Sequence, residues 1–197
     1  LASSGGPVGP ARLVKAPIFA MAVMVALEWS LVLWTALFLI DVAGITAAQG
    51  AIATALLLGG VLVARIVGAG LVVRFGPWRM LVACCALAVV AVTLVLTASS
   101  PGSAYLAATV AGVAAANVYP SCIGLVLGAN PHSPDLSVAR ASLVSTVATM
   151  TWPLFLGWIA DRIGLGQSVY LLFILVAVAA VAVLWAKPKT VASRILA

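Results

Sequence analysis

The stretch 47–73, AAQGAIATALLLGGVLVARIVGAGLVV, decides the fold class of this chain. Its only charged side chain is Arg65. A helix rises about 1.5 Å per residue, so about 20 apolar residues cross the roughly 30 Å hydrocarbon layer of a lipid bilayer. The stretch is long enough to do so, and it predicts one transmembrane helix.

The rest of the chain has the same apolar character. Of its 197 residues, 65% are apolar and 7% are charged, and the mean hydropathy is +1.28. A soluble domain has roughly 45–50% apolar and about 25% charged residues. Four acidic and ten basic side chains cannot cover a water-facing surface of this size. The composition therefore excludes a soluble enzyme, a disordered tail and a fibrous repeat, and it favours an all-α membrane protein embedded in a lipid bilayer.

Five breaks rich in charged, glycine, proline or serine residues divide the chain into six apolar runs. The predicted transmembrane spans are 17–40, 47–73, 80–98, 104–128, 138–160 and 168–186. Residues 1–16 have no apolar signal-peptide core, so they predict a flexible linker, and 187–197 predict a tail. Because the chain does not begin with Met, we expect it to be a fragment of a longer protein.

The basic side chains predict the orientation, because cytoplasmic loops carry an excess of Lys and Arg. Six spans place both termini on one side, together with eight bases, whereas the opposite side has only Arg162. The eight bases are Arg12, Lys15, Arg74, Arg79, Arg140, Lys187, Lys189 and Arg194. We expect a multi-pass protein of the cytoplasmic (inner) membrane with both termini cytoplasmic. Since the bases flank the spans, the net charge of +6 does not indicate a nucleic-acid partner.

An Arg-x-Gly unit occurs twice, each time after the second helix of a set of three. The units are 74–76 (Arg-Phe-Gly) and 162–164 (Arg-Ile-Gly), 88 residues apart. Because each set has an odd number of spans, the two units would lie on opposite membrane faces. This favours an inverted 3+3 repeat, a recurrent plan of secondary transporters, over a chance match of two common loop residues.

Around these units the sequence resembles the major facilitator superfamily of transporters. The run 69–79, AGLVVRFGPWR, resembles the family's loop motif G-x-L-x-D-R-x-G-R-R, with Ala69 in place of its first glycine and Val73 in place of its acid. The run 153–164, PLFLGWIADRIG, resembles the family's eleventh helix, P-x-x-x-G-x-x-A-D-R-x-G. The run 27–34, LEWSLVLW, resembles the seventh helix.

The resemblance covers residues 11–190 and implies the C-terminal six-helix half of a twelve-helix transporter that works by alternating access. It implies that the first and fourth spans line a cavity and that the second and fifth face the N-terminal half. The third and sixth spans would be peripheral. The expected partners are a small-molecule substrate and protons; whether the transporter is a symporter or an antiporter stays open.

The two loop units also supply candidate gating residues. We expect basic and acidic side chains there to brace helix ends by bonding to carboxylates or to helix C-termini, where the helix dipole is negative. The candidates are Arg74, Gly76 and Arg79 on one face and Asp161, Arg162 and Gly164 on the other.

Glu28 lies about 12 residues into its span, near the middle of the bilayer, where a charged carboxylate is costly. It is either a protonatable group or substrate contact in a water-filled cavity, or a structural acid paired with Arg65. Arg65 either makes that pair or extends to the interface. Thr35 lies two turns from Glu28 on the same face, whereas Trp29 and Trp34 point elsewhere. Trp34 could still stack on a sugar-like or aromatic ligand.

The fourth and fifth spans each have a polar face. Asn117, Ser121, Gly124 and Gly128 share one face at helical spacing, Tyr119 lies on another, and Pro120 can bend the helix. We expect this bent face to line the substrate path. In the fifth span, a hydroxyl face suits either interhelical hydrogen bonds or a cavity wall. That face comprises Ser142, Ser145, Thr146 and Thr149, followed by Pro153. In the second span, Gly60, Ala64 and Gly68 should permit close helix packing.

The sequence lacks the residues that a membrane-embedded enzyme or a channel would require. The only histidine, His132, lies in a predicted loop, H-E-x-x-H is absent, and Glu28 is the only acid deep in a span. Asn130-Pro131 occurs once, so a channel built from two half-helices is unsupported. We expect no enzyme, cofactor or metal. Two alternatives stay open: a self-sufficient six-helix transporter that dimerises with a second copy, and a membrane-embedded protein that does not transport.

Overall fold

The computed structural model describes residues 12–131 and 133–188, which form eight helices and no strand. The helices are α1 (Arg12–Ala43), α2 (Ala47–Phe75), α3 (Pro77–Thr97), α4 (Pro101–Ala115), α5 (Val118–Ala129), α6 (Pro134–Ile163), α7 (Leu165–Ser168) and α8 (Tyr170–Trp185). They make six helical segments that are long and apolar enough to cross a membrane, with α4–α5 as the fourth and α7–α8 as the sixth. The chain is therefore an all-α, multi-pass membrane protein, as predicted.

Each predicted span overlaps one of these segments, and all six segments are longer than predicted. The extra residues come from polar helix ends that the apolar pattern does not detect. Thr46 and Ser100 cap α2 and α4 in capping boxes, where the cap hydroxyl and the side chain three residues later satisfy each other's backbone N–H groups. These caps set where α2 and α4 begin.

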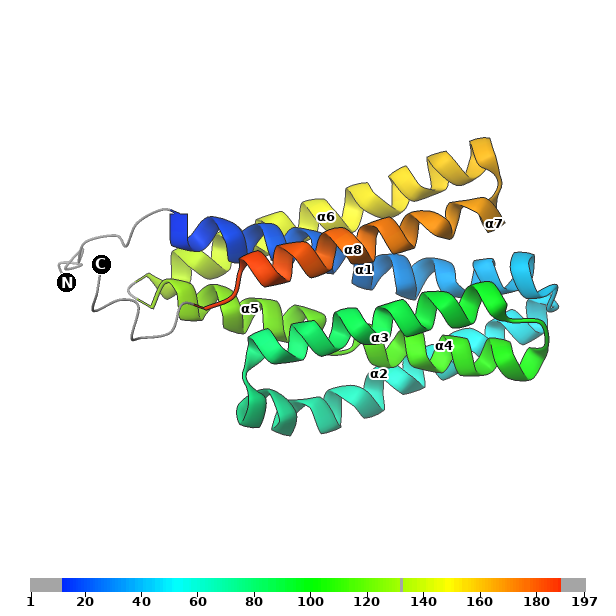
Figure 1. The fold of residues 1–197 in the computed structure, drawn as a ribbon, viewed down its shortest axis with the longest axis horizontal. Coiled ribbons are helices and arrows are strands. Elements are labelled where there is room, and N and C mark those ends of the chain that lie inside the picture. Colours follow the sequence, from blue (N-terminus) through cyan, green and yellow to red (C-terminus); the bar gives the residue numbers. More distant parts are fainter. Residues whose placement is uncertain (1–11, 132, 189–197) are drawn as a thin grey trace.

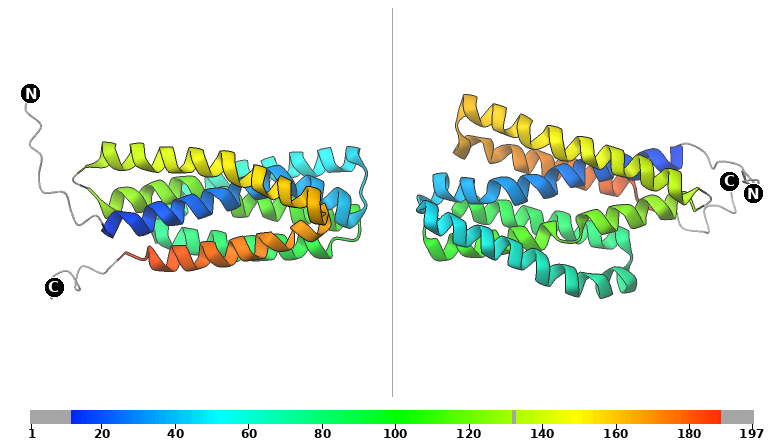
Figure 2. Two further views of the ribbon diagram at one scale, coloured as in Figure 1. Left: turned by 90° about the horizontal axis from the view of Figure 1, so that it is seen from above. Right: turned by 180° about the vertical axis from the view of Figure 1, so that it is seen from behind.

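The six segments run alternately up and down along the long axis (Figure 1). Residues 12 and 188 lie at the same end, which we call the terminal end, together with the α2–α3 turn and the α5–α6 connection (Figures 1 and 2). The α1–α2, α3–α4 and α6–α7 connections lie at the opposite end. The predicted linker 1–16, the tail 187–197 and His132 fall largely or wholly outside the described residues.

Burial divides the spans into three pairs. The most apolar windows of the first and fourth spans are 56% and 61% buried, those of the second and fifth 17% each, and those of the third and sixth 39% and 44%. The order of burial is thus the same in the two sets of three. The central spans are buried because α1 contacts the other helices from all sides, while α2 and α6 keep one face bare.

The two Arg-x-Gly units form the same kind of turn at opposite ends of the bundle (Figure 1). Gly76 has φ 84° and ψ 157°, and Gly164 has φ 92° and ψ 149°, a conformation that side chains with a Cβ rarely adopt. Each glycine donates its N–H to the carbonyl four residues earlier at 2.9 Å and ends one helix where the next begins. The two units therefore lie at opposite ends of the bundle, as the odd number of spans in each set predicts.

Small residues bring the backbones of α2 and α4 together. A Cβ added at Gly60 would lie 2.7 Å from the carbonyl oxygen of Thr109, and one added at Gly112 would overlap the carbonyl of Leu57. Gly68, two turns from Gly60, leaves room for the side chain of Asn117. The close approach predicted from the small residues of the second span is confirmed at Gly60 and Gly68.

Candidate functional site

The fourth span is broken at Ala116 and Asn117, between α4 and α5. Pro120 has no N–H, so it cannot bond to the carbonyl of Ala116, four residues earlier. Asn117 leaves the helical conformation, with φ −107° and ψ 12°. The bend predicted from Pro120 is present as a break, and it leaves the Ala116 carbonyl open to a donor from another helix.

Two reciprocal hydrogen bonds join this break to α2. Arg65 Nε donates to the carbonyl oxygen of Ala116 at 3.0 Å, and Asn117 Nδ2 donates to the carbonyl oxygen of Ala64 at 2.8 Å. Two neighbouring residues of α2 thus exchange bonds with two neighbouring residues of the break. We call these four residues the clasp. Through the clasp, the Ala116 carbonyl, which Pro120 leaves without a helical donor, gains a hydrogen bond inside the protein.

Arg65 also reaches the acid of the central helix. Its Nη2 lies 3.7 Å from Oε1 of Glu28, the one ion pair among the side chains described in 15–131 and 133–188. The pair that the sequence left open is therefore formed. Glu28 is only 7% exposed, and its second oxygen, Oε2, has no hydrogen-bond partner among the described residues. A buried carboxylate with one free oxygen can accept a donor from a ligand.

Glu28 and Arg65 lie on the wall of a cavity of about 290 Å³, which we call the polar pocket. Its remaining lining comes from α1, α5 and α6 and comprises Val25, Trp29, Tyr119, Ser142, Ser145, Thr146 and Thr149. The hydroxyls of Ser145 and Thr146 donate to the carbonyl of Ser142 in their own helix. Of the two roles open to the hydroxyl face, the structure favours the cavity wall, since these donors do not bridge helices.

Two aromatic residues were placed wrongly by the sequence. Trp29 and Tyr119 were expected to point away from the Glu28 and Asn117 faces, but both line the polar pocket. Trp29 is adjacent to Glu28 in the sequence, and the side chains of both residues line the pocket. Tyr119 lies beyond the break, where the helical phase extrapolated from α4 no longer holds.

Four of the six expected path residues do not line the polar pocket: Trp34, Thr35, Ser121, and Asn117, whose side chain belongs to the clasp. Trp34 stacks on Phe38 with ring centroids 6.2 Å apart, and a Cβ added at Gly157 on α6 would lie 3.1 Å from its ring. Thr35 and Ser121 are 1% and 0% exposed, and their hydroxyls have no partner among the described residues. These side chains are packed between helices, away from the Glu28–Arg65 pair.

The candidate gating residues lie at the two ends of the bundle, at the Gly76 and Gly164 turns. Arg74 lies over the ring of Phe75 at 5.3 Å, and Arg162 over the ring of Trp158 at 4.0 Å. Arg79 and Asp161 are exposed. Within the part of the chain that the structure describes, none of these side chains makes an ion pair, so their bracing role stays a prediction.

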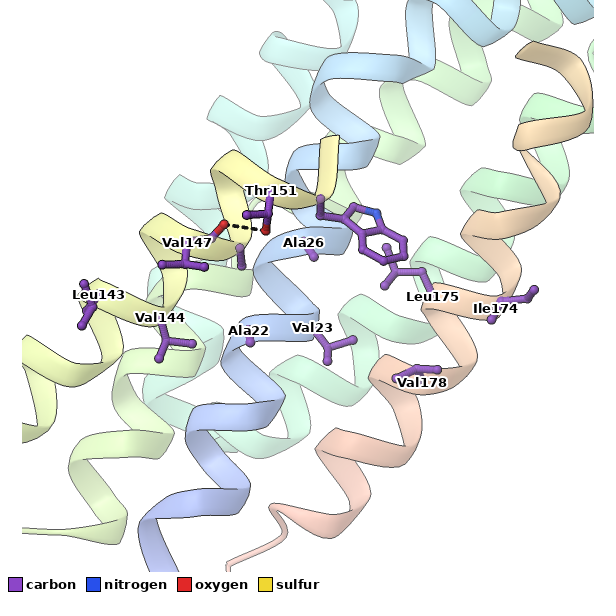
Figure 3. A pocket seen from close by; sticks show the side chains of 12 residues that line it. Ala22, Val23, Ala26, Leu143, Val144, Val147, Thr151, Ile174, Leu175 and Val178 are labelled. Carbon is purple, nitrogen blue, oxygen red and sulfur yellow. Dashed lines mark hydrogen bonds between the residues drawn. The ribbon is translucent and has the colours of Figure 1, made fainter. Parts of the chain in front are cut away.

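A larger cavity of about 540 Å³ lies between α1, α6 and α8 (Figure 3). It is lined by aliphatic residues such as Leu143, Ile174 and Val178, with Trp152 at one side. The hydroxyl of its one threonine, Thr151, is already bonded to the carbonyl of Val147 at 2.7 Å. Such an apolar groove suits lipid acyl chains, whereas the polar pocket holds the charged groups that could select a solute.

No group of three metal-ligating side chains occurs among residues 12–131 and 133–188. Cys84, Cys85 and Cys122 are buried free thiols. The chemistry available at the polar pocket is thus that of one carboxylate, one guanidinium, a phenol, an indole and several hydroxyls: ion pairing, hydrogen bonding and proton exchange. Comparisons with protein-family models, with curated proteins and with solved structures find no match to this chain.

Proposed function

We propose that the chain is one six-helix half of a secondary transporter of the major facilitator type, which moves a small solute by alternating access and couples it to protons. The observation that carries the proposal is Glu28, a buried carboxylate in the middle of a membrane span with a free oxygen at a polar pocket. Ionisable groups at that depth are rare in membrane proteins and mark substrate or proton pathways.

The arrangement of the spans supports the same proposal. The repeated order of burial and the two equivalent glycine turns are what an inverted 3+3 repeat would give. On this proposal α1 and the α4–α5 span line the substrate path. The bare faces of α2 and α6 would meet the N-terminal half, or a second copy of this chain in the dimeric alternative.

The distribution of charge supports the orientation. Bases near the start of α1, the end of α2 and the starts of α3 and α6, and just after α8, belong to the terminal end; they are Lys15, Arg74, Arg79, Arg140 and Lys187. Arg162, in the last turn of α6, belongs to the opposite end. We propose that the terminal end faces the cytoplasm of an inner membrane. The Gly76 turn would then act as the inner gating loop and the Gly164 turn as the outer one.

Glu28 would carry the coupling proton. Its carboxyl is the acid of the polar pocket, and its charge is balanced by Arg65. When the pocket opens to one side, Glu28 can take up a proton there. When it opens to the other side, Glu28 can release the proton and regain the ion pair. A substrate that needs Glu28 in one charge state is then moved together with, or against, the proton.

Glu28→Gln tests this proposal, because it keeps the size and hydrogen bonding of the side chain but fixes a neutral form. The protein is reconstituted in vesicles that enclose a pH indicator, and sugars, amino acids and organic ions are added in turn. We expect at least one of these classes to move protons through the wild type. For that solute, Glu28→Gln should lose pH-driven accumulation but keep solute exchange, and Glu28→Asp should keep some coupling at a shifted pH.

Asp41→Asn is the matched control, since Asp41 is an acid at the far end of the same helix, outside the polar pocket. It should leave coupling unchanged. Uphill, pH-driven accumulation by Glu28→Gln at the wild-type rate would exclude Glu28 as the coupling group. A wild-type protein that moves none of the solutes, when it is reconstituted together with its second six-helix half, would count against transport itself.

A further inference from the structure

We propose that Arg65 is a positioning residue that transmits the charge state of Glu28 to the break in the fourth span, so that α5 moves when Glu28 loses its charge. This inference rests on the proposed function for its purpose, but the geometry behind it is independent. It begins with the Ala116 carbonyl, which Pro120 leaves without a helical donor and which Arg65 takes instead.

The first step is that one guanidinium serves two acceptors. Its Nε bonds to Ala116, and its Nη2 faces Glu28. A guanidinium is planar and rigid, so the two contacts are geometrically linked: a shift of the group toward or away from Glu28 also changes the bond to the backbone. A lysine ammonium has no such spaced donors.

The second step is that the two sides of the break are held by different contacts, and only α4 has its backbone tied to that of α2. α4 is fixed on α2 through Gly60 and Gly112, where the backbones touch. α5 packs instead on α1, α3 and α6, and it carries Tyr119 on the wall of the polar pocket. A change at the break therefore moves α5 relative to α2 while α4 stays in place.

The third step concerns what faces Glu28. Arg65 approaches it from α2, and Tyr119 shares the pocket from α5. The thiols of Cys84 on α3 and Cys122 on α5 are within electrostatic reach, and α6 contributes hydroxyls. Arg65 is thus the charged partner of Glu28 among the described residues. Once Glu28 is neutral, the attraction that draws the guanidinium toward it is lost, so the group can shift and change its hydrogen bond to the Ala116 carbonyl.

The experiment measures the distance between spin labels across the α2–α5 boundary, in vesicles and without added solute. The labels replace two exposed residues near the terminal end, Val73→Cys and Gly128→Cys, with the three buried cysteines changed to alanine. A control pair, Leu62→Cys and Leu106→Cys, joins exposed positions of α2 and α4. We expect the α2–α5 distance to shift between high and low pH, whereas the α2–α4 distance stays constant.

Three variants then test whether Arg65 transmits the charge state of Glu28 to the break or has only a structural role. Glu28→Gln should show the low-pH distance at every pH. Arg65→Lys keeps the charge but cannot bridge both acceptors, so it should lose the pH-dependent shift. Pro120→Ala restores a backbone N–H that can bond to the Ala116 carbonyl, so it should also lose the shift while leaving Glu28 and Arg65 intact.

Absence of a wild-type shift would overturn the inference. So would a shift of wild-type size in Pro120→Ala, which is the decisive variant if Arg65→Lys does not fold. These outcomes say nothing against transport, because the proposed function fails by a different result, namely coupled transport by Glu28→Gln at the wild-type rate.

Discussion

The two halves of the fourth span, α4 and α5, follow each other in the chain but are held by different means. The buried residues of α4 are all alanine or glycine, and its backbone touches that of α2. α5 buries larger side chains such as Leu125 and Val126 and packs on α1, α3 and α6. Gly112 in α4 has no room for a Cβ, whereas Gly128 in α5 faces open space.

This difference is what the proposed movement of α5 requires, namely one half of the span that is anchored and one that is held by side chains alone. In a bilayer, close packing of small residues is a main source of helix association, so α4 is the anchored half. The Pro120 break removes the backbone continuity that would pass this rigidity on to α5. The clasp, rather than a continuous helix, connects the two halves.

The largest expected effect is on the free energy of unfolding, when a glycine of α4 and a glycine of α5 are each changed to alanine. Gly112→Ala places a Cβ against the backbone of Leu57, which cannot move aside, so we expect the free energy of unfolding to fall by about 1–3 kcal/mol. Gly128→Ala meets no atom and should raise it by up to about 1 kcal/mol through better helix propensity. Reversible unfolding in mixed micelles measures both. Equal costs for the two substitutions would show that α4 is not the better anchored half.

A smaller effect is expected at the boundary between the halves. Gly68→Ala would drive the Asn117 side chain away and break its hydrogen bond to Ala64, at a cost of about 1 kcal/mol. In an Asn117→Ala background the same substitution should cost little, because nothing is left to displace. Gly70→Ala, on an open face of the same helix, is the control. Additive costs for Gly68 and Asn117 in this double-mutant cycle would argue against the clasp.

The smallest effect on stability is expected within α5. Ser121 has a fully buried hydroxyl with no partner among the described residues, so Ser121→Ala removes an unsatisfied group. The free energy of unfolding should change by less than about 1 kcal/mol, or rise. A loss well above that in the same unfolding assay would reveal a partner for this hydroxyl and make α5 more tightly held than its contacts indicate.

The sequence predicted the features that depend on local pattern. Apolar runs located six spans, the spacing of Gly60 and Gly68 predicted close packing on α2, and Pro120 predicted a bend. Each rests on residues a few positions apart, which is why periodicity detects them. The Glu28–Arg65 pair stayed one of two alternatives, since depth in a span does not say whether two helices touch.

The rest of the site depends on contacts that no local pattern encodes. That Arg65 bonds to the Ala116 carbonyl follows from the packing of α2 on α4. The sequence did contain a signal for this bond. A proline in a span leaves the carbonyl four residues earlier without its helical N–H donor, and an arginine at membrane depth needs an acceptor. Tyr119 was placed wrongly because the break resets the helical phase, and Thr35 and Ser121 because a shared face need not be a cavity wall.

The aromatic–cation pairs near the two ends of the bundle bear on how the protein sits in membranes of different thickness. Arg162 covers Trp158 at the opposite end, and at the terminal end Lys187 lies over Trp78, whose indole N–H bonds to the carbonyl of Val183. Tryptophan with a neighbouring base is an interfacial anchor. Two such pairs at opposite ends of the bundle are expected to set its depth in the bilayer, so a thinner bilayer should be met by tilting of the helices or by local thickening of the bilayer.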